Sequence, residues 1–131
     1  MGENYLIDTN IIITYLDSKL PEKGMKFIDS IVDAVPKLSI ISKIEVLGFS
    51  FKNTSSHLII NDFINNSSLI NLTDDIVEQT ILIRRTCRIK LPDAIIAATA
   101  LTRNYILLTN DTNDFKNIPG LNIINPWDLK D

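Results

Sequence analysis

The stretch LPDAIIAATAL, residues 91–101, is the most informative part of the 131-residue sequence. It begins with leucine, proline and aspartate, and from Ala94 to Leu101 only Thr99 is polar. Proline is favoured in the first turn of a helix, and a helix that is apolar on almost every side is buried. The stretch therefore predicts a buried helix with one carboxylate, Asp93, at its N-terminus.

On both sides of this helix, strand-like and helix-like patterns alternate along the chain. Short apolar runs predict about five strands, at residues 5–7, 38–41, 68–72, 105–108 and 121–124. Helical spacing predicts further helices that begin near residues 11, 21, 42, 58 and 74. Such alternation favours an α/β fold, in which helices cover a central parallel sheet.

Local signals predict where several of these segments begin. Pro21 is placed in the first turn of the second helix, and Thr73 is placed as the cap of the helix after the third strand. Ser42 and Glu45 have the S-x-x-E spacing of a capping box, which predicts a third helix from Ser42 to about Phe51. Residues 109–114 are expected to form a polar turn.

Composition limits the kind of protein. With 131 residues, 45% of them apolar, the chain is long enough to bury one core, so one domain is expected. The N-terminus does not resemble a signal peptide, and no apolar run is long enough to span a bilayer, so a soluble, cytoplasmic protein without a membrane partner is expected. The net charge of −3 argues against a simple nucleic-acid binder, unless a bound cation neutralises some of the carboxylates.

Acidic residues are predicted at the edge of the sheet where ligands collect in α/β proteins. Asp8 directly follows the first strand, Glu45 lies in the first turn of the helix after the second strand, and Asp111 comes shortly after the fourth. A helix, not a strand, precedes Asp93, so its place at this edge does not follow from the pattern. Carboxylates that lie close together repel and favour a shared cation. Without nearby Cys or His, oxygen ligands suit Mg²⁺ or Mn²⁺.

Each acid also has a structural interpretation. Asp8 is well placed to cap a helix, Asp93 to complement a helix dipole, and Glu45 to complete the capping box. Asp111 and Asp114 are both common residue types in turns.

A group of cations precedes Asp93: Arg84, Arg85, Arg88 and Lys90. Arg84 and Arg88 are spaced to share a helix face. The group is either an RNA-backbone contact or a solvated helix end whose cations favour the C-terminal dipole.

Four segments, taken in order, resemble the motifs of PIN-domain ribonucleases. They are residues 6–11 (LIDTNI), Glu45, residues 91–100 (LPDAIIAATA) and residues 107–111 (LLTND) with Asp114 and Phe115 after them. The resemblance covers essentially the whole chain, and the third motif is the most specific. The length is similar to that of VapC-type toxins, which are magnesium-dependent endoribonucleases of toxin–antitoxin pairs. Residues 1–131 are therefore expected to form a single PIN domain, a three-layer α/β fold with a parallel sheet of about five strands.

The resemblance implies roles for individual residues. Asp8 and Asp93 would be the main ligands of Mg²⁺, or of Mn²⁺, with Glu45 and Asp111 completing the catalytic set. Thr9, Asn10 and Thr109 would orient carboxylates or bind phosphate. Asp114 competes with Asp111 for the fourth acidic position.

The implied reaction is hydrolysis of an RNA phosphodiester by a metal-activated water. The implied partners are an RNA substrate, a cognate antitoxin and a second copy of the chain as a homodimer. The alternatives are a PIN-fold RNA-processing nuclease without a toxin role, and a PIN-fold binding protein without activity.

Two other α/β protein classes fit less well. A phosphatase of the haloacid-dehalogenase type needs a second Asp where Asn10 stands. A phosphorylatable receiver domain needs a Lys where Thr109 ends the late strand.

Overall fold

The computed structural model describes residues 4–48 and 54–129. Within these residues, five short strands form one sheet in the order β3-β2-β1-β4-β5, and every neighbouring pair is parallel. The strands are β1 Tyr5–Ile7, β2 Lys37–Ser39, β3 Ser68–Ile70, β4 Ile106–Leu108 and β5 Ile123–Ile124. The prediction of an α/β fold with a parallel sheet is confirmed.

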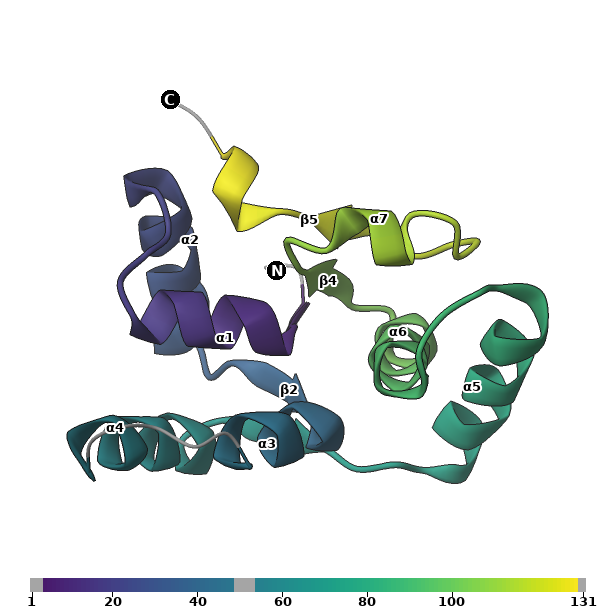
Figure 1. The fold of residues 1–131 in the computed structure, drawn as a ribbon, viewed down its shortest axis with the longest axis horizontal. Helices are drawn as coiled ribbons and strands as arrows, with labels where there is room; N and C mark the ends of the chain where they lie inside the picture. Colours follow the sequence, from purple (N-terminus) through teal and green to yellow (C-terminus); the bar gives the residue numbers. More distant parts are fainter. Residues whose placement is uncertain (1–3, 49–53, 130–131) are drawn as a thin grey trace.

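Helices cover both faces of the sheet and produce three layers (Figure 1). One face is covered by the first four helices, α1 Thr9–Leu16, α2 Glu22–Asp33, α3 Ile40–Leu47 and α4 Thr54–Asn65. The other is covered by α5 Asp74–Thr86, α6 Leu91–Arg103 and the short α7 Thr112–Phe115. A 3₁₀ turn, η1 Pro126–Asp128, follows β5. No helix in the described ranges is both long and apolar enough to cross a membrane.

The central strands are buried on both faces because successive side chains point to opposite sides. Leu6 and its register partner Leu107 belong to the apolar cluster under α5 and α6. The next pair, Ile7 and Leu108, belongs to the cluster under the first four helices. All four side chains are almost fully inaccessible to solvent. This two-sided burial explains why the strands are continuous apolar runs instead of alternating patterns.

Some predicted helix boundaries were wrong. The third helix begins at Ile40, and its N-cap is Ser39, whose hydroxyl accepts a hydrogen bond from the Ile41 N–H. Ser42 and Glu45 therefore do not form a capping box, because Ser42 is already the third helical residue. The predicted end of this helix at Phe51 lies outside the described residues.

Other local predictions need smaller changes. Pro21 is the N-cap of α2 and not part of its first turn. Thr73 is the N-cap of α5, but its hydroxyl bonds to the Asp75 carboxylate instead of a backbone amide. The expected polar turn contains the helix α7. Since α5 ends at Thr86, Arg84 and Arg88 do not share a helix face.

The direction of α6 brings Asp93 to the same edge as the other acids. Helix α6 ends just before β4, to which it is joined at the amino edge of the sheet. Its 13 residues extend about 20 Å. Its first turn, which contains Asp93, is therefore at the carboxyl edge, beside the end of β1.

Candidate active site

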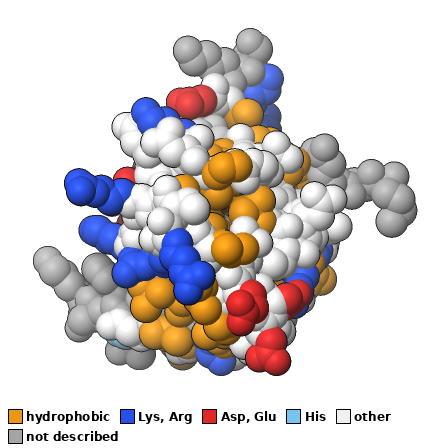
Figure 2. Space-filling model, turned by 90° about the vertical axis from the view of Figure 1, so that its right-hand side faces the viewer, with side chains coloured by type: hydrophobic (Ala, Val, Ile, Leu, Met, Phe, Trp, Pro, Cys, Tyr) orange, Lys and Arg blue, Asp and Glu red, His pale blue; other side chains and the backbone are white. Residues whose placement is uncertain are grey.

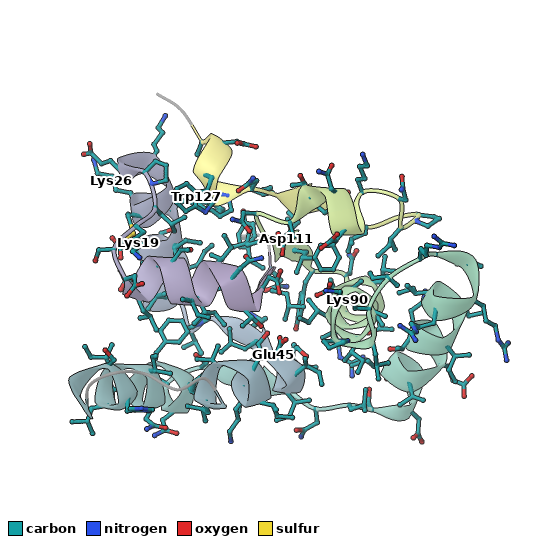
Figure 3. All side chains as sticks on the ribbon, viewed as in Figure 1. Lys19, Lys26, Glu45, Lys90, Asp111 and Trp127 are labelled. Carbon is teal, nitrogen blue, oxygen red and sulfur yellow. The ribbon has the colours of Figure 1, made fainter. Side chains whose placement is uncertain are left out.

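Four acids predicted from the sequence line one cavity at the carboxyl edge of the sheet. Its volume is about 240 Å³, and it is lined by Asp8, Thr9, Asn10, Ile13, Glu45, Asp93 and Asp111. Figure 3 shows Glu45 from α3 and Asp111, the residue before α7, on opposite sides of the start of α1. Segments separated by about a hundred residues along the chain thus contribute to one site.

Asp8 is held rigidly at the junction of β1 and α1. It is the N-cap of α1, and its Oδ1 accepts a hydrogen bond of 2.8 Å from the Thr9 N–H. Its Oδ2 accepts hydrogen bonds from the Thr109 hydroxyl at 2.8 Å and from the Asn10 amide at 3.2 Å. A carboxylate has about four lone-pair positions, so Asp8 keeps capacity for one further partner. The capping interpretation of Asp8 and its placement in the site are therefore compatible.

Burial changes the acidity of Asp8. The side chain is only 4% exposed. Loss of hydration raises the pKa of Asp8 to about 6, although hydrogen bonds from Thr109 and Thr9 oppose the rise. The carboxylates of Asp93 and Asp111 raise it further. A buried carboxylate whose charged form is disfavoured in this way gains from a nearby cation.

Asn10 and Thr109 connect Asp8 to Asp111. The Asn10 amide donates to Asp111 Oδ2 at 2.9 Å as well as to Asp8. The fully buried Thr109 hydroxyl donates to Asp8 and accepts from the Asp111 N–H at 3.0 Å. These two polar side chains fix the spacing of two carboxylates that would otherwise repel each other.

Glu45 is oriented through Thr9. The Thr9 hydroxyl donates to Glu45 Oε1 at 2.7 Å and lies 3.1 Å from the hydroxyl of Ser42. Ser42 is fully buried, three residues before Glu45 in α3. Sequence reasoning treated Ser42 only as a cap and missed this contact. The signal that could have revealed this contact is Ser39, which is also a suitable N-cap residue. A helix that begins after Ser39 includes both Ser42 and Glu45, which then lie on one face at i and i+3.

Asp93 differs from Asp8, Glu45 and Asp111 because its carboxylate accepts no hydrogen bond from any described residue. It lies in the first turn of α6, where the helix dipole favours an anion. Partial burial raises its pKa, and the carboxylates of Asp114, Glu45 and Asp111 raise it further, while Lys90 opposes the rise. Of the four acids that line the 240 Å³ cavity, Asp93 thus has the most free lone pairs.

The structure divides the two candidates for the fourth acid between adjacent cavities. Asp111 lines the cavity that contains Asp8 and Glu45. Asp114, in α7, lines a neighbouring cavity together with Asp93. Both carboxylates act on the pKa of Asp93. Either acid therefore lies close enough to Asp93 to contribute to the same charge cluster.

The donor set suits a hard divalent cation. The lining of the 240 Å³ cavity contains four carboxylates and no Lys or Arg. Among residues 4–48 and 54–129, no three acidic, His or Cys side chains converge closely enough to hold one ion by themselves. Mg²⁺ is commonly held by one or two carboxylates, with water and substrate phosphate completing its shell. The residues present fit that pattern.

Comparison with known proteins places this fold and site in a family. The family model for the PIN domain matches residues 5–121. The chain belongs to the PIN domain family. The PIN resemblance inferred from the sequence is confirmed, and the predicted three-layer architecture agrees with it.

Solved structures superimpose on almost the full length of the chain. A chain of the toxin–antitoxin complex from Klebsiella pneumoniae is 30% identical, with a TM-score of 0.74, and the match covers 96% of this chain and 100% of that one. A chain of DNA-bound VapBC from Salmonella typhimurium is 21% identical, with a TM-score of 0.81 and coverage of 95% and 99%. FitAcB from Neisseria gonorrhoeae gives 21% identity, a TM-score of 0.76 and the same coverage. Comparison with curated protein sequences gave no match.

Proposed function

We propose that this PIN domain is a Mg²⁺-dependent endoribonuclease and the toxin of a type II toxin–antitoxin pair. The observation behind the proposal is a cavity at the carboxyl edge of the sheet that four carboxylates line without any Lys or Arg. The PIN family is one of nucleases, and the match of 30% identity is to a toxin–antitoxin complex. Mn²⁺ is expected to substitute for Mg²⁺, because both are hard ions that prefer oxygen ligands.

Asp8 and Asp93 would hold the metal ion, with Glu45 and Asp111 acting directly or through water. When bound, the ion would activate a water molecule and neutralise charge on the phosphodiester and on its leaving oxygen. Thr109 and Asn10 keep Asp8 and Asp111 apart at a fixed distance, and Thr9 orients Glu45. Preorganised carboxylates lower the reorganisation needed during catalysis.

Replacement of Asp93 by asparagine tests the proposed function. This change keeps the size of the side chain and removes its negative charge. The Asp93 carboxylate accepts no hydrogen bond from the described residues, so the change breaks no hydrogen bond among them. Cleavage of total RNA in Mg²⁺ should disappear with the Asp93→Asn protein, while its circular dichroism and melting temperature stay close to those of the parent. Asp128→Asn, an exposed change in η1, is the matched control and should cleave normally.

EDTA should stop cleavage, and Mg²⁺ or Mn²⁺ should restore it. Intact RNA after incubation with metal-loaded parent protein would refute the nuclease role, and a PIN-fold binding protein without activity would then be favoured. Normal cleavage by Asp93→Asn would refute the assignment of this residue.

The toxin role has a separate test. Expression of the protein should arrest growth, and co-expression of a small DNA-binding protein encoded beside it, the expected antitoxin, should relieve the arrest. RNA cleavage without growth arrest would instead favour an RNA-processing nuclease. The proposal also places one PIN domain, as a homodimer, in the cytoplasm with its RNA substrate; light scattering of the purified protein would measure its oligomeric state.

A further inference from the structure

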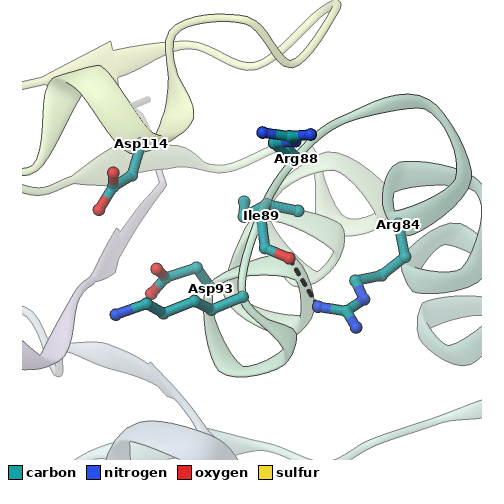
Figure 4. Close-up of a pocket in the computed structure, with 6 residues that line it drawn as sticks. Arg84, Arg88, Ile89, Asp93 and Asp114 are labelled. Atoms are coloured by element: carbon teal, nitrogen blue, oxygen red, sulfur yellow. Dashed lines mark hydrogen bonds between the residues drawn. The ribbon is translucent and has the colours of Figure 1, made fainter.

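A second cavity, of about 400 Å³, lies beside the acidic one and contains most of the local positive charge (Figure 4). Its lining consists of Arg84, Arg88, Ile89, Lys90, Asp93 and Asp114. Asp93 lines both cavities, so it forms the boundary between them. In Figure 4 the carboxylates of Asp93 and Asp114 lie on one side and the two arginine side chains on the other.

The three cations of this basic cavity lie beyond ion-pair distance of every described carboxylate, although Lys90 is near enough to oppose the rise in the pKa of Asp93. Among the described residues, neither Arg84, Arg88 nor Lys90 forms an ion pair, although two acids line the same cavity. Some cations elsewhere are paired, namely Lys19 with Asp17, Lys26 with Glu22 and Arg103 with Asp75, whereas Lys43, Arg85 and Lys116 also form no ion pair among the described residues but line neither cavity. The charge in the basic cavity is therefore available to an external anion.

The basic cavity is also partly preorganised. Arg84, in the last turn of α5, donates from Nη1 to the Ile89 carbonyl oxygen at 2.6 Å (Figure 4). This hydrogen bond connects the end of α5 to the segment before α6, where Lys90 is the N-cap. A guanidinium group has five N–H donors, so donors remain for a ligand. Figure 2, which faces this side of the molecule, shows Lys and Arg side chains gathered on one part of the surface.

We infer that the basic cavity binds a backbone phosphate of single-stranded RNA next to the phosphate that is cleaved. This inference rests on the proposed nuclease function. A strand that reaches the acidic cavity at Asp93 enters the basic cavity on the other side of the same residue. Arginine binds phosphate through charge-assisted hydrogen bonds, and such contacts fix the position of a nucleic acid without reading its sequence.

An acidic peptide is the other anion with suitable charge. RNA is favoured because the two cavities are adjacent: a bound cation in the acidic cavity would attract one phosphate, and the basic cavity is placed to hold its neighbour. Two successive phosphates of one RNA strand would satisfy both cavities at once, and polyglutamate tests whether the carboxylates of an acidic peptide do so equally well.

Arg88→Ala tests the inference, with Arg85→Ala as the matched control. Both arginines are exposed and close in sequence, but Arg85 does not line the basic cavity. Binding of a short fluorescent single-stranded RNA is measured by anisotropy with Ca²⁺ in place of Mg²⁺, because Ca²⁺ takes the same oxygen ligands in a looser geometry and is not expected to support cleavage. Arg88→Ala should weaken binding about tenfold, the effect of losing one hydrogen bond to a charged group. It should also reduce the slope of log K against log salt by about 0.7, the value for one phosphate contact on a single strand.

Kinetics provide a second measurement. The contact between Arg88 and the phosphate is expected to be equally strong in the bound substrate and in the transition state. Arg88→Ala should therefore raise KM with little change in kcat. Arg88→Glu should have a larger effect than Arg88→Ala in both assays, and Arg85→Ala should resemble the parent. Equal melting temperatures of these variants would exclude unfolding as the cause.

The outcomes separate this inference from the nuclease proposal. If the parent cleaves RNA and Arg88→Ala and Arg85→Ala have equal effects, the inference is refuted and the nuclease role stands. If polyglutamate binds as tightly as RNA with the same dependence on Arg88, the basic cavity is a peptide site and the inference is refuted. If RNA binding depends on Arg88 but no RNA is cleaved, the RNA site is supported and the nuclease role is refuted.

Discussion

Asp8→Asn should remove a pH dependence of stability that the buried carboxylate creates in metal-free protein. The change keeps the size and shape of a side chain that is 4% exposed. It removes the negative charge and leaves the other acids of the cavity in place. The difference between parent and variant therefore isolates the contribution of Asp8 from that of Asp93, which titrates in both proteins.

The magnitude follows from the pKa of Asp8, which is about 6 in the folded protein against 3.8 for an ordinary aspartate. Between these values the folded state holds a proton that the unfolded chain has released, so stability falls as the pH rises through this window. Well above pH 6 the ionised side chain costs about 3 kcal/mol relative to an unperturbed aspartate. Between about pH 5 and about pH 8 the parent should lose about 1 kcal/mol more of its unfolding free energy than Asp8→Asn does.

Urea denaturation in EDTA, followed by circular dichroism at the two pH values, measures this difference. The parent should approach or fall below the variant in stability as the pH rises. Mg²⁺ at the higher pH should stabilise the parent more than the variant, because a ligand that binds only the folded state adds its binding free energy. Parallel pH profiles of the two proteins would refute the reasoning, since Asp8 would then have the same pKa in both states.

Three further substitutions examine the surroundings of the site. Thr109→Val should lower the unfolding free energy by about 1–3 kcal/mol, because it removes hydrogen bonds to Asp8 and from the Asp111 N–H; unchanged urea denaturation would contradict this. Ser42→Ala should reduce kcat several-fold through the Thr9 hydroxyl and cost about 1 kcal/mol of stability, whereas parent-like kinetics would show that the contact has no role. Val35→Asn should stabilise the protein by about 1 kcal/mol, because valine is strained at the observed φ of 65°, and a lower melting temperature would disprove that.

The sequence was sufficient to predict the sheet and Asp8, because both depend on local patterns. Burial of strands on both faces produces apolar runs, and a polar residue directly after such a run must lie at the carboxyl edge. The position of Glu45 was predicted for the wrong reason. Ser39 and Ser42 are both suitable N-cap residues by type. The structure shows that Ser39 is the cap, while Ser42 lies inside the helix and is fully buried.

The position of Asp93 depends on topology more than on local pattern. The sequence indicated a helix before it, so its place at the carboxyl edge did not follow from the pattern. The structure shows that the deciding connection is the one after α6: this helix leads into β4 at the amino edge, so it begins at the carboxyl edge. The choice between Asp111 and Asp114 did not follow from sequence either, because a short helix, α7, replaced the expected turn and directed the two side chains into different cavities.

The distribution of charge also changes how the net charge of −3 should be understood. Five of the 16 acids line the two adjacent cavities, and the chain has 13 Lys and Arg. Three basic residues line these cavities as well, so 11 acidic and 10 basic residues lie outside them and nearly balance. A divalent ion bound among the carboxylates would offset part of the local negative charge, and the unpaired arginines stand next to it. The acidic composition thus does not oppose RNA binding everywhere on the surface. A phosphate on the basic side of Asp93 meets arginine and lysine, whereas a phosphate on the acidic side needs a bound cation.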